Sequence, residues 1–319
     1  MSVSAVAVII VNAGVYDDLE NCLNSVLSGT RLAHEVVVVD NVVEQRRLAM
    51  LEAKFGAKVR WIPMERNVGF GVANNIGVAK SSASLLLLLN PDTIVPMGAI
   101  DRLVAIFEEN PKLGVLAPTL LNRDGTTQAS AYALDPSVRA MCLDAFGLQF
   151  LYRALALHTN SARARNISSR NTAWLKGACL LLRRRVWDQL SGFDQSFYMF
   201  GEDADLCRRA REGGLQVAVT DRVRITHIGG TSYANSGMGE RAVRDYYSGY
   251  ELLALRQGSG RFVRSRRRLL RVAMWTAAFS RSVYLGATSP AHPGRRAAAR
   301  AYWKYVRSPC QPNSPGLRA

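Results

Sequence analysis

Five consecutive leucines, residues 85–89, followed by Asn90-Pro91-Asp92, place the tightest constraint on how this chain can fold. An apolar run of this length, bounded by a proline, indicates a strand that is buried on both faces. Pro91 cannot donate to a strand ladder, so it ends the strand, and it restricts Asn90 to an extended conformation. The pattern places the carboxylate of Asp92 at the open end of a core strand. Taken alone, a carboxylate there is often only a turn or cap residue.

Short apolar runs alternate with longer amphipathic stretches through the first 120 residues. Buried strands are predicted at residues 5–12, 35–41, 59–63 and 84–92, and helices at residues 16–29, 44–56 and 71–81. This alternation is typical of an α/β protein with a mostly parallel sheet flanked by helices. Ligands bind such sheets at the carboxyl ends of the strands, where Asn12, Asp40 and Asp92 are expected.

The later sequence suggests a second half and an extension. Asp124-Gly125 predicts a hairpin turn, residues 135–172 contain helical stretches, residues 160–171 form a polar loop, and a compact block spans Trp174 to His227. The chain, 319 residues of which 48% are hydrophobic, is long enough for one large domain or two fused ones. We expect a first half over 1–120, a second half over 121–245, and a basic helical extension over 246–319. Residues 308–319 have the composition of a disordered tail.

The net charge of +16 belongs to the extension. Fourteen of the 41 Lys and Arg residues follow Glu251 and no acidic residue does, so residues 1–255 hold 41 − 14 = 27 basic and 25 acidic residues. The main domain is therefore close to neutral.

The cysteines and the hydropathy of the sequence indicate the cellular compartment in which the protein is expected. The five cysteines, Cys22, Cys142, Cys179, Cys207 and Cys310, form no C-x-x-C pair, which favours buried free thiols in a reducing environment. The first twelve residues lack the features of a signal peptide, and no apolar stretch reaches the roughly 18 residues of a membrane-spanning helix. A cytoplasmic protein is expected.

Three further segments carry side chains suited to a site. Residues 67–79 contain Gly69 and Gly71 without the third glycine of a dinucleotide fingerprint; they indicate either a tight turn into a helix or a loop that lets a nucleotide approach the backbone. Glu202, Asp203 and Asp205 follow an aromatic cluster; they are either helix-terminus acids or a desolvated general base, with Asp205 expected to cap. His227, which precedes two glycines, is either structural or a metal ligand.

Seven motifs in one order give the chain a family resemblance. They are the strand ending Val11-Asn12, VVVVDN (36–41), NVGFGVANNIG (67–77), LLLLNPD (86–92), WLKGACLLLRR (174–184), GFDQSFYMFGEDADLCRR (192–209) and THIGGTS (226–232). Together they cover about residues 5–233. In these residues the chain resembles family 2 glycosyltransferases of GT-A architecture, in particular the bacterial branch that includes rhamnosyltransferases of polysaccharide assembly.

The resemblance implies that residues 1–120 form the nucleotide-sugar-binding half and residues 121–245 the acceptor-binding and catalytic half. It also implies a role for each matching residue. Asp40 would bind the nucleotide base with Asn12 and Asn74 nearby, and Asn67, Gly69 and Asn90 would complete the nucleotide-sugar site. Asp92 would hold Mg²⁺ or Mn²⁺ with His227 as a further ligand. Asp203 would be the catalytic base, with Glu202 the next residue to test. Trp174, Gly177 and Ala178 would line the sugar and acceptor pocket.

The sequence departs from the family pattern at three places. Asn90 replaces the acidic first residue of the D-x-D metal motif, which suggests contact with ribose or ordering of the turn instead. The loop DNVVEQ (40–45) lacks the usual serine and aspartate, and VNA (11–13) lacks the usual aromatic residue after Asn12.

The implied reaction is direct displacement with inversion. The expected donor is dTDP-L-rhamnose, with UDP-linked galactofuranose or hexoses as alternatives, and the acceptor is a hydroxyl of a lipid-linked or polysaccharide glycan.

Two other function classes stay open. A nucleotidyltransferase is disfavoured because no basic glycine-rich loop follows the first strand, and a non-catalytic sugar-binding protein would be expected to lack Asp92, Asp203 or His227.

The basic extension allows three interpretations. Residues 261–286 place Phe262, Trp275 and Phe279 among arginines, which suits a peripheral helix on an anionic membrane at the inner face of the cell membrane. We expect residues 256–307 to form that surface. Nucleic-acid binding is the less favoured rival, because no nucleic-acid module is visible. A helix that only packs on the domain is the third.

Overall fold

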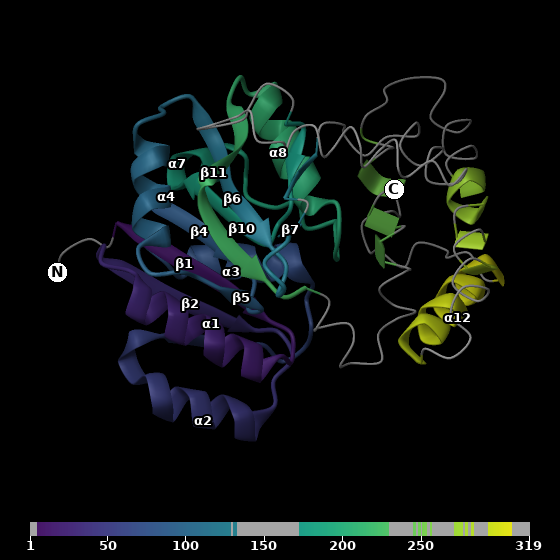
Figure 1. Ribbon diagram of the computed structural model, residues 1–319, viewed down its shortest axis with the longest axis horizontal. Coiled ribbons are helices and arrows are strands. Elements are labelled where there is room, and N and C mark those ends of the chain that lie inside the picture. Colours follow the sequence, from purple (N-terminus) through teal and green to yellow (C-terminus); the bar gives the residue numbers. More distant parts are fainter. Residues whose placement is uncertain are drawn as a thin grey trace.

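The computed structural model describes one mixed sheet between two layers of helices (Figure 1). The described residues are 5–128, 130–132, 172–229, 245–246, 248–249, 251–253, 256, 271–276, 278–279, 282–283 and 293–307. The expectations for residues 133–171 and for the tail at 308–319 lie outside this part of the chain, as do Cys142 and Cys310. Cys22, Cys179 and Cys207 are buried free thiols, as expected.

The central sheet follows the strand order β3-β2-β1-β4-β10-β6-β11-β5, and β7 pairs with β6. The strands are β1 (Val6–Asn12), β2 (His34–Asp40), β3 (Arg60–Pro63), β4 (Leu85–Leu89), β5 (Thr93–Ile94), β6 (Leu113–Leu121), β7 (Thr127–Gln128), β10 (Cys179–Arg183) and β11 (Gln216–His227). A separate small ladder joins β8 (Ala131–Tyr132) to β9 (Trp174–Leu175). Strands of both expected halves thus belong to one sheet, and the boundary at residue 120 stays a prediction.

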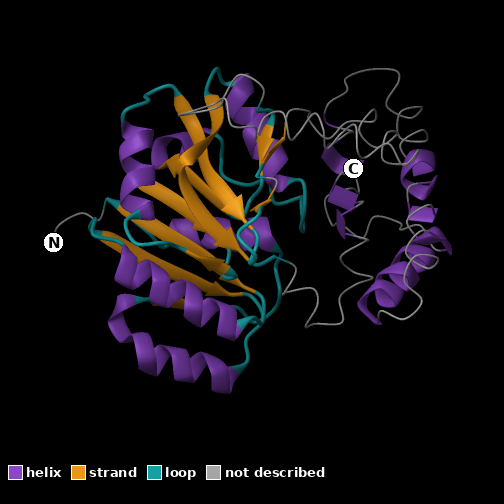
Figure 2. Ribbon diagram, in the orientation of Figure 1, coloured by secondary structure: helices purple, strands orange, loops and turns teal. Residues whose placement is uncertain are grey.

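Helices cover both faces of this sheet (Figure 2). They are α1 (Tyr16–Gly29), α2 (Gln45–Phe55), α3 (Phe70–Ala79), α4 (Ala99–Glu108), α7 (Arg184–Gln189) and α8 (Glu202–Glu212), with the short 3₁₀ turn η1 (Gly56–Lys58) after α2 and α12 (Pro293–Arg307) in the extension. Apolar residues of α1, α2 and α4 join the core on one face. Those of α3, α7 and α8 join the core on the other.

The leucine run shows why the sequence needs this layered arrangement. Leu85, Leu87 and Leu89 belong to the core under α1 and α4, while Leu86 and Leu88 belong to the core under α3 and α8. Side chains alternate between the two faces of a strand, so a strand covered on both sides is apolar at every position. The expected buried strand is confirmed.

The sheet is parallel only in part. β1, β2, β3 and β4 run parallel, as expected for the first half. β10, which lies between β4 and β6, is antiparallel to both neighbours, and β5 and β7 also pair in the antiparallel sense. The strand-helix pattern of the first 120 residues could not reveal this pairing, because β10 comes from residues 179–183.

The hairpin expected at Asp124-Gly125 is present between β6 and β7. Leu120 pairs with Gln128, Gly125 has a φ of +82°, and Asp124 Oδ1 accepts the backbone N–H of Thr126 at 3.0 Å. Its consequence for function is that it carries Gln128 back to the end of β11, where Gln128 Oε1 lies 2.7 Å from His227 Nδ1.

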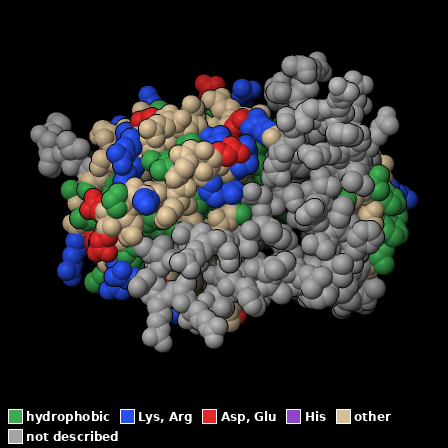
Figure 3. Space-filling model, turned by 90° about the horizontal axis from the view of Figure 1, so that it is seen from above, with side chains coloured by type: hydrophobic (Ala, Val, Ile, Leu, Met, Phe, Trp, Pro, Cys, Tyr) green, Lys and Arg blue, Asp and Glu red, His purple; other side chains and the backbone are tan. Residues whose placement is uncertain are grey.

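In the described part of the extension, aromatic side chains form one cluster. Trp275 stacks on Phe279 with ring centroids 5.6 Å apart, and Phe279 lies 6.0 Å from the ring of Trp303 in α12. All three rings remain substantially exposed, and hydrophobic side chains gather at this edge of the molecule (Figure 3). Among the described helices, none has both the length and the hydropathy to cross a bilayer.

Candidate active site

A cavity of about 480 Å³ opens at the carboxyl ends of β1, β2 and β4. Its wall includes ten of the residues predicted from the sequence: Asn67, Gly69, Asn90, Asp92, Trp174, Gly177, Ala178, Glu202, Asp203 and His227. These residues come from segments more than 150 positions apart, which the sheet brings to one rim. The position agrees with the rule that α/β sheets bind ligands beyond their carboxyl ends.

Asp92 and His227 lie side by side because β5 pairs with the end of β11, placing Thr93 opposite His227. Gly229 donates its backbone N–H to Asp92 Oδ2 at 3.0 Å, and His227 Nε2 lies 3.3 Å from Asp92 Oδ1. Both side chains are at most 6% exposed. The turn after the leucine strand therefore holds its carboxylate against the histidine at the cavity wall.

Gln128 defines which nitrogen of His227 carries a hydrogen. Gln128 Oε1 lies 2.7 Å from His227 Nδ1 and also accepts from Lys176 Nζ at 2.8 Å. A side-chain amide oxygen can only accept, so His227 Nδ1 is the donor. Asn90 Nδ2 lies 3.2 Å from the other ring nitrogen, Nε2.

This arrangement fits a divalent cation. His227 Nε2 lies 3.3 Å from Asp92 Oδ1, and a neutral imidazole nitrogen and a carboxylate oxygen this close together are ligands that a divalent cation would bind in common. The buried Asn90 Oδ1 has no hydrogen-bond partner among the described residues. Among the described residues, no group of three or more His, Cys, Asp or Glu side chains is placed to bind a metal. Oxygen atoms of a bound diphosphate would serve as further ligands.

Asp203, in the first turn of α8, is the carboxylate held by backbone donors. Its Oδ2 accepts the N–H of Gly177 at 2.9 Å and its Oδ1 accepts the N–H of Ala204 at 2.8 Å. Burial raises the pKa of Asp203, while these hydrogen bonds and the positive charge of Lys176 lower it. The result is a raised pKa, as a general base working near neutral pH requires.

Glu202 precedes Asp203 in α8, and its surroundings stabilise a negative charge less well than those of Asp203. Its side chain is buried, and its Oε2 has no hydrogen-bond partner within the described structure. Burial and then the charge of Asp203 raise the pKa of Glu202. Because Asp203 accepts two backbone N–H groups and Glu202 Oε2 accepts none, the negative charge is favoured on Asp203 and the proton on Glu202.

Three predicted residues lie behind the cavity wall. Asp40 is fully buried; its Oδ1 accepts from Asn12 Nδ2 at 2.9 Å and its Oδ2 from the hydroxyl of Tyr16 at 2.6 Å. Asn74 donates to the carbonyl of Phe70 at 3.0 Å within α3. Burial raises the pKa of Asp40 and these two donors lower it.

Asn41, directly after Asp40, lines the cavity and was not singled out from the sequence. Its Nδ2 donates to Asn67 Oδ1 at 2.9 Å and to the carbonyl of Gly69, and its Oδ1 accepts the N–H of Val68. The side chain thus organises the loop before α3. The available signal was its place at the end of VVVVDN, one residue beyond the carboxylate that drew attention.

Gly69 and the aromatic segment before α8 form one wall of the cavity. Gly69 has a φ of +90°, and a Cβ there would collide with the carbonyl oxygen of Tyr198. That oxygen accepts the N–H of Phe70 at 3.0 Å. Phe200, with a φ of +66°, adopts the left-handed conformation just before the helix. Such backbone strain concentrates at functional sites.

Trp174, Gly177 and Ala178 form the wall around Asp203. Trp174 belongs to the small β8–β9 ladder and lines the cavity. The carbonyl oxygen of Ala178 accepts the backbone N–H of Asn90 at 2.9 Å. A Cβ on Gly177 would lie 3.4 Å from Asp203 Oδ2, an ordinary van der Waals contact, so Gly177 packs directly against the carboxylate. Segments 90–92 and 176–178 are thereby held next to each other.

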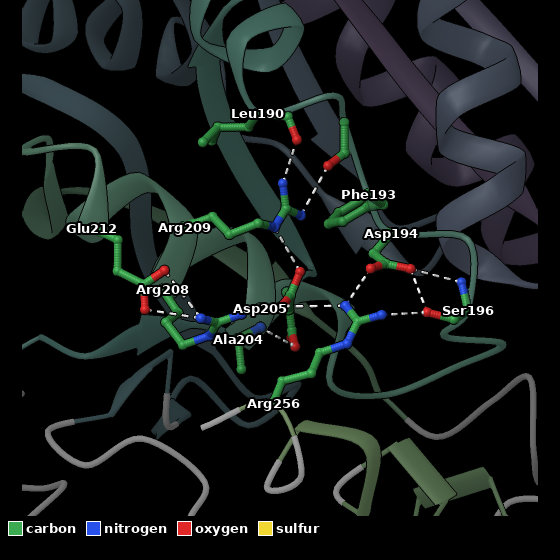
Figure 4. A network of polar contacts seen from close by, with 12 residues as sticks. Leu190, Phe193, Asp194, Ser196, Ala204, Asp205, Arg208, Arg209, Glu212 and Arg256 are labelled. Atoms are coloured by element: carbon green, nitrogen blue, oxygen red, sulfur yellow. Dashed lines mark hydrogen bonds and ion pairs between the residues drawn. The ribbon is translucent and has the colours of Figure 1, made fainter. Parts of the chain in front are cut away.

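Asp205 does not cap the helix as expected but anchors it (Figure 4). Its carboxylate is fully buried and accepts from Arg208 at 2.8 Å and from Arg209 at 2.7 Å. Arg209 also donates to the carbonyl groups of Leu190 and Gly192. Gly201 occupies the N-cap position, so Asp205 lies one turn too far along α8 to reach the free N–H groups.

The network continues toward the extension. Arg256 pairs with Asp194 and lies 3.7 Å from Asp205 Oδ1, and it donates to Ser196 Oγ at 2.7 Å. The turn at residues 192–196 and the start of α8 are therefore fixed by arginines on both sides. This places Glu202 and Asp203 on a rigid support.

Two relatives support the family assignment in sequence. The chain is 28% identical over 180 residues to N-acetylglucosaminyl-diphospho-decaprenol L-rhamnosyltransferase of Mycobacterium tuberculosis, a match that covers 53% of this chain and 58% of that protein. It is 30% identical over 168 residues to rhamnosyltransferase WbbL of Escherichia coli, covering 50% and 60%. The chain spans less than two thirds of the length of either relative.

Solved structures show the fold. Mannosyltransferase PcManGT of Pyrobaculum calidifontis, solved with GDP-Man and Mn²⁺, superposes with a TM-score of 0.58 at 14% identity, covering 98% of this chain and 89% of that one. GalNAc-T7, solved with UDP, GalNAc and Mn²⁺, gives 0.55 at 15% identity, covering 85% and 55%. Both likenesses confirm the GT-A fold expected from the sequence.

A family model covers most of the chain. The model described as glycosyltransferase like family 2 matches residues 4–248, which include the whole central sheet and every residue of the cavity named above. The expected family and the expected enzyme class are confirmed. This chain belongs to glycosyltransferase family 2.

Proposed function

We propose that the chain is an inverting, divalent-metal-dependent transferase that moves L-rhamnose from dTDP-rhamnose to a hydroxyl of a lipid-linked or polysaccharide acceptor. The observation that carries the proposal is one cavity of about 480 Å³ that is lined by Asp92, His227 and Asp203. Two rhamnosyltransferases among the relatives support the donor and the acceptor class. A hexosyltransferase of Haloferax volcanii, 25% identical over 225 residues, keeps galactofuranose or hexose donors as the alternative.

Asp92 and His227 Nε2 would hold Mg²⁺ or Mn²⁺, with Asn90 Oδ1 as a neutral oxygen beside them. When bound, the ion supplies Lewis-acid stabilisation of the departing diphosphate. Gln128 orients the His227 ring through its contact with Nδ1, so that Nε2 is the nitrogen that would bind the ion.

Asp203 carries out the proton transfer in this proposal. Its ionised carboxylate takes the proton of the acceptor hydroxyl while the hydroxyl oxygen forms a bond to the anomeric carbon from the face opposite the diphosphate. The bond between that carbon and the diphosphate oxygen breaks, and its electron pair leaves with the nucleotide. The N–H groups of Gly177 and Ala204 keep the carboxylate oriented.

The donor contacts follow from the cavity wall. Asn67, Gly69, Asn90 and Asp92 line it and would touch the nucleotide-sugar directly. Asn12, Asp40 and Asn74 would act from behind the wall by holding the strand ends and α3 in place. Trp174, Gly177 and Ala178 would surround the transferred sugar and the acceptor.

Nucleotide-sugar hydrolysis and transfer test the proposal. We expect turnover of dTDP-rhamnose with Mn²⁺, and loss of turnover in Asp92→Asn and Asp203→Asn, with Asp203→Asn still binding donor. Asp188→Asn changes the same charge at an exposed position and should retain activity. A preference for a UDP-sugar would select the alternative donor, and no turnover of any nucleotide-sugar would leave a non-catalytic binding protein as the better conclusion.

We further propose that residues 256–307 dock on an anionic membrane surface, where a lipid-linked acceptor would be reached. Trp275, Phe279 and Trp303 form an exposed aromatic cluster, and no acidic residue follows Glu251. Aromatic rings at the headgroup level and basic side chains together favour this placement.

Liposome flotation of the full chain tests this second proposal. Phe279→Ser with Trp303→Ser should reduce binding to anionic vesicles, whereas Met97→Ser, at an apolar side chain that is 77% exposed elsewhere, should not. If the double variant instead loses affinity for a labelled oligonucleotide and keeps vesicle binding, the extension binds nucleic acid. If the unsubstituted chain binds neither the vesicles nor the oligonucleotide, the extension only packs on the domain.

A further inference from the structure

Lys176 projects into the active-site cavity, although the sequence motifs gave it no role. It directly follows β9, and its backbone N–H donates to the carbonyl of Ser130 at 2.9 Å. Its side chain reaches Gln128 Oε1, at 2.8 Å from Nζ. Both ends of the residue are therefore fixed, and its ammonium lies at a defined place in the wall.

That place is beside the proposed diphosphate site. Gln128 Oε1 accepts from both Lys176 Nζ and His227 Nδ1, so one amide oxygen separates the ammonium from the imidazole. Burial lowers the pKa of Lys176, and the negative charges of Asp92 and Asp203 offset part of this shift. The ammonium is thus close enough to interact with both the carboxylate next to His227 and the carboxylate proposed as base.

Lys176 is a basic residue in a cavity wall whose other charged side chains, as far as the structure describes them, are acidic. Among the described residues of the wall, Lys176 is the sole lysine or arginine, whereas Asp92, Glu202, Asp203 and Asp245 are acidic. A nucleoside diphosphate brings further negative charge into this space. The proposed ion has few anionic ligands from the chain, since Asn90 is neutral and the described residues supply no cluster of three metal-binding side chains.

We propose that Lys176 binds the diphosphate of the donor directly and acts as a built-in cation for the leaving group alongside the divalent ion. This inference rests on the proposed function. As the bond between the anomeric carbon and the diphosphate oxygen breaks, Nζ–H groups of Lys176 donate to the phosphate oxygens that gain charge. Lys176 keeps its protons, and the proton of the acceptor goes to Asp203. Such a cation lets the site hold a diphosphate when the divalent ion is absent.

Nucleotide binding without metal is the direct test. The affinities of the full chain for dTDP, dTMP, UDP and UMP are measured by calorimetry in EDTA and again in Mn²⁺. In EDTA the wild type should prefer a diphosphate over its monophosphate. Lys176→Gln should weaken diphosphate binding in EDTA by about 10- to 100-fold, the range for loss of a charge-assisted hydrogen bond, and should change monophosphate binding far less.

Two matched variants separate a phosphate contact from a structural role. Lys176→Arg keeps the charge and should retain most of the preference for the diphosphate in EDTA. Lys112→Gln removes an equal charge at an exposed position and should behave as wild type. Melting temperatures measured without nucleotide confirm that each variant is folded.

The outcomes distinguish this inference from the proposed function. If wild type binds diphosphates only in Mn²⁺, or if Lys176→Gln keeps wild-type affinity for the diphosphate in EDTA, Lys176 merely neutralises Asp92 and Asp203 and the inference is wrong, while the transferase proposal stands. If Lys176→Gln lowers monophosphate and diphosphate binding equally, the role is structural and the inference is also wrong. If no nucleotide binds even in Mn²⁺, both proposals are overturned.

Discussion

Single side chains determine the chemistry of this cavity through the neighbours they are given. Asp203 and Glu202 are adjacent in sequence and both are buried, but only Asp203 has two backbone N–H donors. This difference assigns the charge to Asp203 and the proton to Glu202. His227 likewise owes its ring orientation to Gln128, which contacts Nδ1. The residue scale is therefore where protonation predictions belong.

The turnover of the enzyme should depend on the ionisation of Asp203. A general base must be ionised, and the raised pKa of Asp203 moves its ionisation above the region near pH 4 where an ordinary aspartate titrates. We expect turnover at saturating metal, donor and acceptor to fall as the pH is lowered through this raised pKa. A profile of kcat against pH checks this. An acid limb centred near pH 4 would contradict the assignment.

Glu202 should cost stability at neutral and higher pH. Its pKa is raised in the folded state, so the stability present below its unfolded pKa of about 4.3 is lost as the pH rises through the folded pKa. Glu202→Gln removes this loss and should raise the free energy of unfolding by about 1–3 kcal/mol at pH 8, and by less at pH 5. Chemical denaturation at both values checks the difference, with Glu109→Gln, an exposed residue, as control.

At the scale of elements, the site depends on how loops and helix ends are supported. Three polar strand ends were expected to face one ligand; the structure places Asp92 in the cavity wall, whereas Asn12 and Asp40 hydrogen-bond to each other behind it. Periodicity shows where a strand ends but not which way the last side chain points. The side chain of Asp40 points toward α1, because the hydroxyl of Tyr16 in that helix donates a hydrogen bond to it.

Helix α8 should lose its support when Asp205 is altered. Asp205→Asn removes the buried carboxylate that pairs with the partly buried Arg208 and Arg209, and we expect a loss of about 3 kcal/mol in the free energy of unfolding. Glu212 also pairs with Arg208, but its side chain is 60% exposed, so Glu212→Gln should cost at most about 1 kcal/mol. Equal effects in urea denaturation would show that the buried network does not hold the helix.

The loop before α3 offers a second matched pair. Gly69 and Gly98 both have positive φ, so alanine is strained at either position. A Cβ at Gly98 meets nothing within 4 Å, whereas one at Gly69 collides with the carbonyl oxygen of Tyr198. Gly69→Ala should therefore weaken nucleotide binding at least about tenfold relative to Gly98→Ala, a difference near 1.4 kcal/mol. Calorimetry with dTDP and UDP in Mn²⁺ measures the ratio.

At the scale of the whole molecule, the two expected halves share one sheet. β10 comes from the second half and pairs with β4 through Leu181 and Leu87, between the first-half strands β4 and β6. The sequence was sufficient for the α/β class, the buried strands and the hairpin, because those depend on local patterns. It was insufficient for β10, and for the contact between Gln128 and His227, because these need partners about 90 to 100 residues away.

A fragment of residues 1–121 should therefore not fold stably. Without β10, the ladder edge of β4 has no partner and leucines of the buried strand become exposed, which favours aggregation. We expect the full chain to unfold in one cooperative transition over the central sheet and the fragment to show none. Thermal melting followed by circular dichroism compares the two. A cooperative transition in the fragment would contradict the shared-sheet account.

The leucine strand also limits how the protein could acquire another specificity. Every side chain of β4 is committed to one of the two helical layers, so none of them is available to meet a substrate. Only the tripeptide beyond it, and the loops that meet it at the rim, can be exchanged without disturbing the interior. A change of sugar specificity, by evolution or by engineering, would therefore require substitutions in residues 90–92 and the neighbouring loops, with the core of the sheet unchanged.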